Sequence, residues 1–588
     1  MAIKSTNPLP APKRQEKKIQ KKSQPRKKKG APLSLQERFA ALAIRYFGGM
    51  AGPLEKRIPT IGETLLMSNM FIAPQAFLSM VLFITFLSVP LAVFGALMFA
   101  VAQNALFLSL AVVPAGTLAI GLYMPSSSKN GRASAVDGEL AFVIGYLSVL
   151  ITGGVSPIEL FRRLSRSAIF PASAREAKRI IMNVDILALD PVTAIEKAAR
   201  HTPNKMLSDF LSGYIAVLKI GGDIKSYMEQ KQKEVYNHRS IKLKATTEFV
   251  GTLAEAYLAA TVVMGTSLFI LQIVQAMVSR AEFSYGMMYF YAGIFMPAIT
   301  GAFIFILHSL QTKEPLKSIK QHVVFLAGLA FVPLMAFVVP LQEPMYLKLG
   351  IGLVAASAPA AIVHIMDARR RQAAERMLPS FILDLAEVRK TGLAPEKCIE
   401  QLSTRNYGEL TPYVRRMASQ VSWGVPLNKV LKDFGKELKS WFVVSIGFIL
   451  LEVVEIGGGT TTLFSSLADF TQRTRELEKE RKTLFRPYIF LPYIGAVLTI
   501  ASTVLIVSMM TTQLAGIASG GTGIVQVQTD TRTLSDVMLT AAVFQGWLMG
   551  MVGGKMAEWS IGSGYKHASI LVVVCLLTVY LINMVAGG

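Results

Sequence analysis

Long apolar stretches alternate with polar stretches along the whole chain. Nine of the apolar stretches approach the length of about 20 residues that a helix needs to cross a bilayer. Backbone polar groups inside a bilayer must be satisfied within the segment, which favours helices. The pattern predicts an all-α polytopic membrane protein of about nine transmembrane helices, near residues 75–98, 104–124, 247–278, 287–309, 322–340, 345–366, 486–511, 533–553 and 566–586.

The two longest polar stretches repeat the same landmarks in the same order. Gly154-Val155-Ser156-Pro157 matches Gly392-Leu393-Ala394-Pro395. Lys219-Ile220-Gly221-Gly222 matches Glu455-Ile456-Gly457-Gly458 at nearly the same offset along the chain. Self-similarity at a fixed spacing indicates one structural unit used twice. We therefore expect two homologous domains, at roughly 126–244 and 367–484.

Both repeats have the pattern of helices. Met206, Phe210 and Tyr214 recur at helical spacing in a run that stops at Gly221-Gly222. Asp190-Pro191 is a typical helix start. Neither repeat shows sustained alternation of apolar and polar residues with turn signals, which would predict strands. Each repeat is therefore expected to be a bundle of about five or six helices, hinged onto the membrane helix that follows it.

Glycine and proline mark the expected turns between these helices. Pro157 follows Ser156 in a helix-start pattern. Gly221-Gly222 would either cap a helix or act as a hinge for domain motion. The turn or hinge candidates are Gly154, Pro157, Gly221, Gly222, Gly392, Pro395, Gly457 and Gly458.

The positive charge predicts an orientation in the membrane. The net charge is +23, and Lys and Arg concentrate in the N-terminal segment and in the two repeats. Because basic residues accumulate on the cytosolic side, we expect both repeats and the N-terminus inside and the C-terminus outside. The two repeats would then share one orientation, unlike the inverted repeats of many transporters.

These boundaries divide the chain into seven segments. The basic segment 1–33 cannot bury a core and should be disordered; it would bind anionic lipid headgroups or serve only as a topology signal. The expected order is a basic tail (1–33), an amphipathic helix and linker (34–70), transmembrane helices 1–2 (71–125), the first cytosolic domain (126–246), transmembrane helices 3–6 (247–366), the second cytosolic domain (367–485) and transmembrane helices 7–9 (486–588).

The sequence contains no motif that is typical of a catalytic site. The sequence Gly553-Gly554-Lys555 lacks the spacing of a phosphate-binding loop, and the six histidines form no short-range metal-binding pair. We expect no enzyme activity, no metal and no cofactor. Glu255 is the one candidate within a span, where a charge is costly; it would contact a partner or couple domain motion, unless it is solvated at the cytosolic boundary.

The repeated motifs resemble a known family. Gly153–Glu159 followed by Leu218–Asp223 and a basic helix resembles the type II secretion system F domain. Lys390–Glu396 followed by Glu455–Gly459 resembles the same domain a second time. Two such domains in a chain of about nine spans resemble the archaeal platform protein of archaella and type IV pili, over roughly residues 70–588.

The resemblance implies a role as an assembly platform in the cytoplasmic membrane. A cytosolic hexameric secretion ATPase would dock on the soluble domains, and its motion would move pilin-like or archaellin subunits from the bilayer into a filament. A homodimer would match a two-fold or six-fold motor. Because both repeats carry excess positive charge, the docking candidates are Arg162, Arg163, Arg166, Lys219, Asp223, Lys225, Lys231, Lys233, Arg369, Arg370, Arg371, Arg415, Arg416, Arg473 and Arg475.

The repeats also differ at matched positions. Lys219 is replaced by Glu455, and Asp223 by Gly459, which predicts that the two domains dock unequally. Two other functions stay open, a polytopic transporter and an enzyme acting on lipid. Scarce charge within the spans weighs against the first, and the lack of catalytic clusters against the second. An archaellum, an adhesion pilus and a DNA-uptake pilus would all need the same platform.

Overall fold

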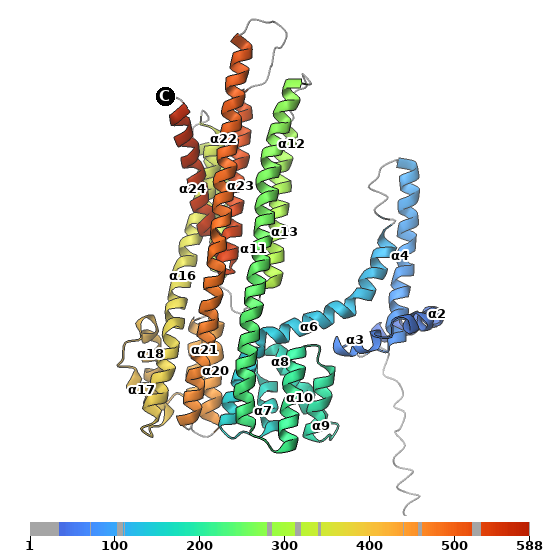
Figure 1. Cartoon of the computed structure of the whole chain (residues 1–588), viewed down its shortest axis with the longest axis vertical. Coiled ribbons are helices and arrows are strands. Elements are labelled where there is room, and N and C mark those ends of the chain that lie inside the picture. Colours follow the sequence, from blue (N-terminus) through green and yellow to red (C-terminus); the bar gives the residue numbers. More distant parts are fainter. Residues whose placement is uncertain are drawn as a thin grey trace, which may run out of the picture. The chain divides into compact units, whose positions relative to one another are not determined.

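The protein is described by a computed structural model in which helices are the main regular element (Figure 1). It describes residues 35–70, 72–102, 110, 112–278, 285–311, 319–338, 343–438, 440–456, 461–519 and 531–586, and no strand occurs in these ranges. The expected basic tail 1–33 lies outside them. Two compact units are present, Met1–Ser134 with His201–Asn204, and Ala135–Arg200 with Lys205–Gly588.

The first unit is built on the packing of one amphipathic helix against an apolar helix. Phe39 and Phe47 meet the ring of Phe83 edge to face, at centroid distances of 5.2 and 6.1 Å. Leu42 and Tyr46, which share the predicted apolar stripe with Phe39, are exposed. Only part of the predicted apolar stripe is therefore buried within the unit. The helices are α2 (Leu35–Arg57), α3 (Ile61–Met67), α4 (Pro74–Ala102) and the beginning of α6 (Val113–Thr152).

Long apolar helices form one end of the second unit (Figure 1). Glycine allows the tightest of their contacts, because a Cβ at Gly554 or Gly550 would overlap the backbone of Gly564 or Ala568 on the facing helix. The helices are α11 (Ile224–Val278), α12 (Tyr285–Phe290), the π-turn η2 (Tyr291–Phe295), α13 (Met296–Leu310), α14 (Lys320–Gly328), α15 (Phe331–Val338), α16 (Met345–Arg389), α22 (Phe490–Ser519), α23 (Thr531–Glu558) and α24 (Ile561–Ala586).

Two bundles of shorter helices lie together at the other end of the same unit (Figure 1). Their shared end confirms the predicted parallel repeat. The first bundle comprises the end of α6, α7 (Pro157–Arg166), α8 (Pro171–Asp185), α9 (Pro191–His201), α10 (Lys205–Ile220) and the start of α11. The second comprises the end of α16, α17 (Pro395–Leu402), η3 (Gly408–Leu410), α18 (Thr411–Ser422), α19 (Leu427–Leu438), α20 (Trp441–Glu455), α21 (Thr461–Phe485) and η4 (Arg486–Ile489).

Eight helices of the described residues are long and apolar enough to cross a membrane. Seven of them correspond to predicted spans over most of their length, and Val113–Thr152 contains only the second half of the predicted span 104–124, whose first half lies largely outside the described residues. The remaining one, 322–340, corresponds to a shorter apolar stretch, Lys320–Met335. A turn at Leu329-Ala330 divides it between α14 and α15. A multi-pass membrane protein is therefore confirmed, with eight candidate spans and one broken, shorter segment among the described residues.

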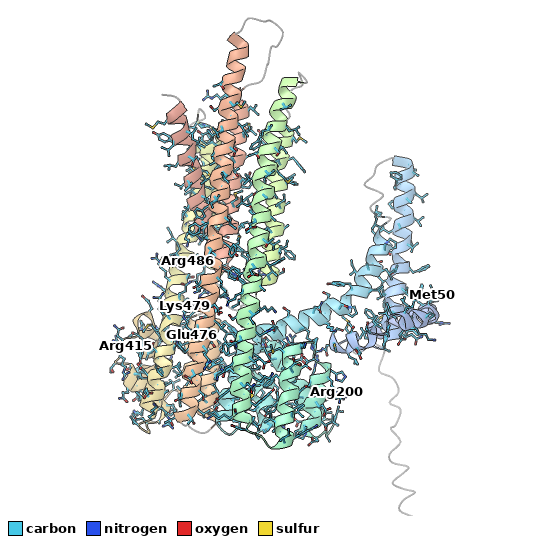
Figure 2. All side chains as sticks on the ribbon, viewed as in Figure 1. Met50, Arg200, Arg415, Glu476, Lys479 and Arg486 are labelled. Atoms are coloured by element: carbon cyan, nitrogen blue, oxygen red, sulfur yellow. The ribbon has the colours of Figure 1, made fainter. Side chains whose placement is uncertain are left out.

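Several helices continue from a membrane-crossing segment into a bundle. α11 is unbroken from Ile224 to Val278, so the hinge predicted between the first bundle and its membrane helix is wrong. In the second repeat, the single 3-10 turn η4 separates α21 from α22. Figure 2 shows Glu476, Lys479 and Arg486 following one another along this connection toward the apolar helices. Helices shared by both regions can transmit a displacement of a bundle to the membrane.

Candidate functional site

The two bundles share one hydrophobic core. Phe142 on α6 meets Trp441 of the second bundle edge to face, with ring centroids 4.3 Å apart. Tyr146, one turn further on, lies 5.7 Å from Phe448. Gly145 lies between these residues, and any Cβ at that position would overlap the ring of Phe470. The bundles thus form a single packed body at one end of the long helices.

An ion pair crosses the same interface. Arg163 Nη1 on α7 lies 2.8 Å from Glu452 Oε2 on α20, and its Nε lies 3.4 Å from Glu159. Burial acts to lower the pKa of Arg163, but the hydrogen bond and charge of Glu452 outweigh it and raise the pKa. The guanidinium therefore stays charged. Arg163, a predicted docking residue, is thus bound to a partner within the chain.

Repeat-equivalent positions on α11 and on α21–α22 face one another. Lys244 and Glu480 stand at matched positions of the two repeats, and Lys244 Nζ lies 4.0 Å from the Glu480 carboxylate. Further along, a Cβ at Gly495 would lie 3.1 Å from Leu258, which is next to its matched position. Matched positions thus meet at two levels along these helices.

The docking candidates of the first bundle differ in their contacts: some form ion pairs, one caps a helix and others are exposed. Arg162 pairs with Asp185 at 3.0 Å, and Lys231 with Glu234 at 2.7 Å. Asp223 accepts from the Lys225 amide at 3.0 Å and caps the start of α11. Lys219 is exposed and lies 3.6 Å from Glu196, whose pKa is lowered by its hydrogen bond to Arg200 and by the charge of Lys219. The side chains of Arg166, Lys225 and Lys233 are exposed.

The candidates of the second bundle are spread over α16, α18 and α21, and only Arg371 and Arg475 meet, at the carboxylate of Glu375. Arg369, Arg370 and Arg371 lie on α16 about 30 Å before its end at Arg389, by the helical rise per residue. Arg475 lies 3.9 Å from Glu375, and Arg416 lies 2.6 Å from Glu437. Figure 2 places Arg415 and Arg200 on opposite flanks of the two bundles. Arg473 is exposed on α21.

The turn candidates have the geometry of helix ends. Gly154, Gly221 and Gly392 have φ values of 76°, 72° and 84°, which side chains rarely adopt. Gly222 N bonds Val217 O at 3.0 Å, which closes the end of α10. Pro157 and Pro395 each begin a helix, although Ser156 makes no side-chain capping bond there. Gly457 and Gly458 lie outside the described residues, and a hinge role stays a prediction.

Glu255 is exposed on α11, between residues that pack into the bundle. Its neighbours Ala254 and Tyr257 are buried. Tyr257 bonds the hydroxyl of Thr300 at 3.1 Å, and the side chain of Glu255 projects from another face of the helix. This placement suits either a contact with a partner beside the bundle or a position at the membrane boundary.

A partly buried polar network among the membrane helices was missed by sequence reasoning. His322 Nδ1 lies 2.9 Å from the hydroxyl of Tyr565, and His567 Nδ1 lies 2.7 Å from that of Tyr493. Glu558 lies 3.4 Å from His364 and 3.6 Å from Lys566. Lys555, which is fully buried, donates to Gln311. The partners are mostly on different helices, so short-range sequence motifs could not reveal them.

Metal ligands are not grouped in the part of the chain that the structure describes: no three His, Cys, Asp or Glu side chains lie close enough to hold an ion. The two cysteines, Cys398 and Cys575, are buried and free. Burial raises the pKa of the Cys398 thiol.

Comparison with known proteins gives a family for both repeats. The family model of type II secretion system protein F matches residues 143–272 and again 381–508. The chain therefore carries two copies of the type II secretion system protein F domain. The spacing between the starts of the two matched segments is the spacing between the Gly154 and Gly392 motifs, so both measures define the same repeat.

A relative from an archaeon extends the similarity beyond the two domains. An uncharacterised protein of Methanocaldococcus jannaschii is 24% identical over 498 residues, which cover 77% of this chain and 81% of the relative. No solved structure matches the chain significantly. Proteins of this family are membrane platform proteins of type II secretion and type IV pilus systems.

Proposed function

We propose that this protein is the cytoplasmic-membrane platform of a machine that assembles a type IV filament. A cytosolic hexameric secretion ATPase docks on the two bundles, and its motion is coupled to the transfer of pilin-like or archaellin subunits from the bilayer to the filament base. The N-terminus and bundles face the cytosol, the C-terminus faces outside, and the platform acts as a homodimer.

The observation that carries this proposal is the continuity between the bundles and the membrane helices. The two bundles share one core, so a force on either acts on both. α11 and α16, both within the second unit, each continue from a bundle into an apolar, membrane-length segment. An unbroken helix is a rigid connection, because bending it requires the loss of backbone hydrogen bonds. This arrangement suits the transmission of motion from a cytosolic motor.

Co-purification tests the proposal. The full chain is isolated from its native membranes in mild detergent, and the proteins that accompany it are identified by mass spectrometry. The expected partners are a hexameric secretion ATPase and subunits with a pilin-like apolar helix, whose identity would name the filament. A preparation of unrelated membrane protein, purified in the same detergent, is the control. Absence of both partners would contradict the proposal.

One observation favours a transporter as the second candidate function. The network around Lys555, His364 and His567 places ionisable groups among membrane helices, where they often mark ion pathways. However, these groups are bonded to neighbours, as expected of a network that fixes helix positions. Substrate-dependent flux in reconstituted vesicles, abolished by Lys555→Met, would favour transport over the platform.

A further inference from the structure

The turn that follows the second helix of each bundle exposes large apolar side chains. Ile186 and Leu187 follow α8 and are 70% and 56% exposed, while Trp423 follows α18 and is 86% exposed. Leu187 and Trp423 stand at matched positions of the two repeats. The next residues, Ala188 and Gly424, both have positive φ, 50° and 77°. The two repeats therefore present equivalent apolar tips, which we name tip 1 (Ile186 and Leu187) and tip 2 (Trp423).

Backbone hydrogen bonds hold both turns in one conformation. In the second turn, Gly424 N bonds Val421 O at 2.9 Å and Val425 N bonds Gln420 O at 3.0 Å. In the first turn, Leu189 N bonds Asn183 O at 3.1 Å. Apolar side chains on a closed turn lose little freedom on binding, which favours their use as anchors. Tryptophan is also enriched among the residues that dominate binding energy at interfaces.

Both tips point away from the membrane helices. The amides of Ala172 and Ser173, at the start of α8, bond the Glu139 carboxylate on α6 at 3.0 and 2.8 Å. α6 continues well beyond Glu139 before it ends, and Asp185 at the end of α8 pairs with Arg162 in the middle of α7. Since α7 begins just after α6 ends, the end of α8 and tip 1 lie at the membrane-distal side. Tip 2 occupies the matched position in the second bundle.

Basic side chains accompany both tips. Arg179 and Arg415 are repeat equivalents, two turns before tips 1 and 2, and Arg179 lies 3.6 Å from Glu176 on its own helix. Lys178 and Lys429 are exposed on the same helical hairpins. The acidic groups near tip 1 are already engaged, Asp185 with Arg162 and Asp190 with the amides that begin α9. The charge beside the tips therefore favours a partner with acidic side chains.

We propose that tips 1 and 2 insert into two identical, acid-rimmed apolar sockets on neighbouring subunits of one cytosolic ring, which is the ATPase of the proposed function. Two equivalent tips in one chain match a partner that offers the same socket more than once, and a ring of identical subunits does so by symmetry. A lipid surface is disfavoured because the tips lie at the end remote from the membrane helices. This inference rests on the proposed function.

Binding between the full chain in nanodiscs and the co-purified hexameric ATPase tests the inference. Trp423→Ser is expected to weaken binding about 30-fold and Leu187→Ser about 10-fold, because loss of either tip leaves single-site attachment. Ile241→Ser removes an apolar side chain that is also exposed, but on α11 outside the tips, and should bind like the unmodified chain. Because all three side chains are exposed, thermal unfolding should not change.

The outcomes separate the two proposals. If the unmodified chain binds the ATPase and both tip variants bind equally well, the tip inference is wrong and the platform function stands. If the unmodified chain does not bind the ATPase at all, both fail. If the variants keep ATPase binding but lose self-association in sedimentation, the tips contact a second copy of the chain, which also overturns the inference. Loss of binding to vesicles of anionic lipid instead would assign the tips to the membrane.

Discussion

Arg163 and Glu452 form an ion pair of 2.8 Å that joins the two repeats across 289 residues of sequence. Both side chains are largely buried, so removal of one partner leaves a charge in a poorly solvated place. The pair therefore sets how the repeats are oriented, beside the larger apolar contact of Phe142 with Trp441. A force on one bundle would pass to the other through this interface.

Substitutions of Arg163 and Glu452 should have strongly coupled effects on the free energy of unfolding. Glu452→Met is expected to lower the free energy of unfolding by about 1–3 kcal/mol, because Arg163 loses its closest partner. The double variant Arg163→Met/Glu452→Met should regain most of that loss, since no unpaired charge remains. Thermal unfolding in one detergent measures both. Arg166→Met, at the exposed end of α7, is the control, and additive losses in the double variant would contradict the pairing.

Gly145 should tolerate no larger side chain. Gly145→Val would place carbon atoms on the Phe470 ring and is expected to destabilise the protein by about 1–3 kcal/mol through overpacking. Gly131→Ala, on the same helix with open space around it, should be neutral or slightly stabilising. Phe470→Ala combined with Gly145→Val tests the cause, because it removes the obstructing ring. Equal effects of Gly145→Val and Gly131→Val on thermal unfolding would argue against the packed interface.

Exchange of alanine and glycine at two matched turn positions should change thermal stability in opposite directions. Ala188 adopts a φ of 50° and its repeat equivalent Gly424 a φ of 77°, a region where a Cβ costs about 1 kcal/mol. Ala188→Gly should therefore be neutral to slightly stabilising, because relief of strain offsets the greater freedom of the unfolded chain. Gly424→Ala should destabilise by about 1 kcal/mol. The two midpoints of thermal unfolding, measured against the unmodified chain, check the signs; a loss of stability in Ala188→Gly would contradict this account.

Much of the fold could be predicted from local sequence patterns, because apolar stretches and glycine motifs recur along the chain. Apolar length predicted most of the candidate spans, and the motifs at Gly154 and Gly392 predicted the parallel repeat. The predicted hinge before the third span failed because the sequence change near Lys244 is one of polarity only, and a helix can continue from water into a bilayer. The fifth span is divided by a turn at Leu329-Ala330, which follows Gly328 and precedes Pro333. These two residues are a usable signal, but apolar length alone does not register it.

The sites were harder to predict because they depend on contacts between distant residues. Arg163 was chosen for its charge, but its partner Glu452 lies in the other repeat. Lys555 and Gln311 are likewise far apart in the sequence, so neither residue indicates the other. Trp423 had a usable signal, a tryptophan beside a glycine in a polar turn at the position of Leu187. That signal becomes clear only when the exposure of the Trp423 side chain is known.

Cys398 should resist thiol reagents in the folded protein. Its side chain is buried at the start of α17, and burial raises the pKa of the thiol. Because the thiolate is the reactive form, a raised pKa leaves less of it between pH 7 and about 8.5. In a Cys575→Ala background, maleimide should add to Cys398 only after denaturation, as measured by mass. Rapid labelling of the folded chain at pH 7 would show that α17 is open.

The difference between Lys219 and Glu455 should make ATPase docking unequal. Lys219 is exposed at the end of α10 near Glu196, whereas its equivalent Glu455 lies 4.0 Å from Arg163 at the interface of the bundles. Lys219→Glu reverses a charge available to a partner, so it should weaken recovery of the ATPase in a pull-down, most strongly at low salt. Glu455→Lys should affect recovery less and lower thermal stability instead, because it repels Arg163. Equal losses of ATPase from both variants, with unchanged stability, would contradict unequal docking.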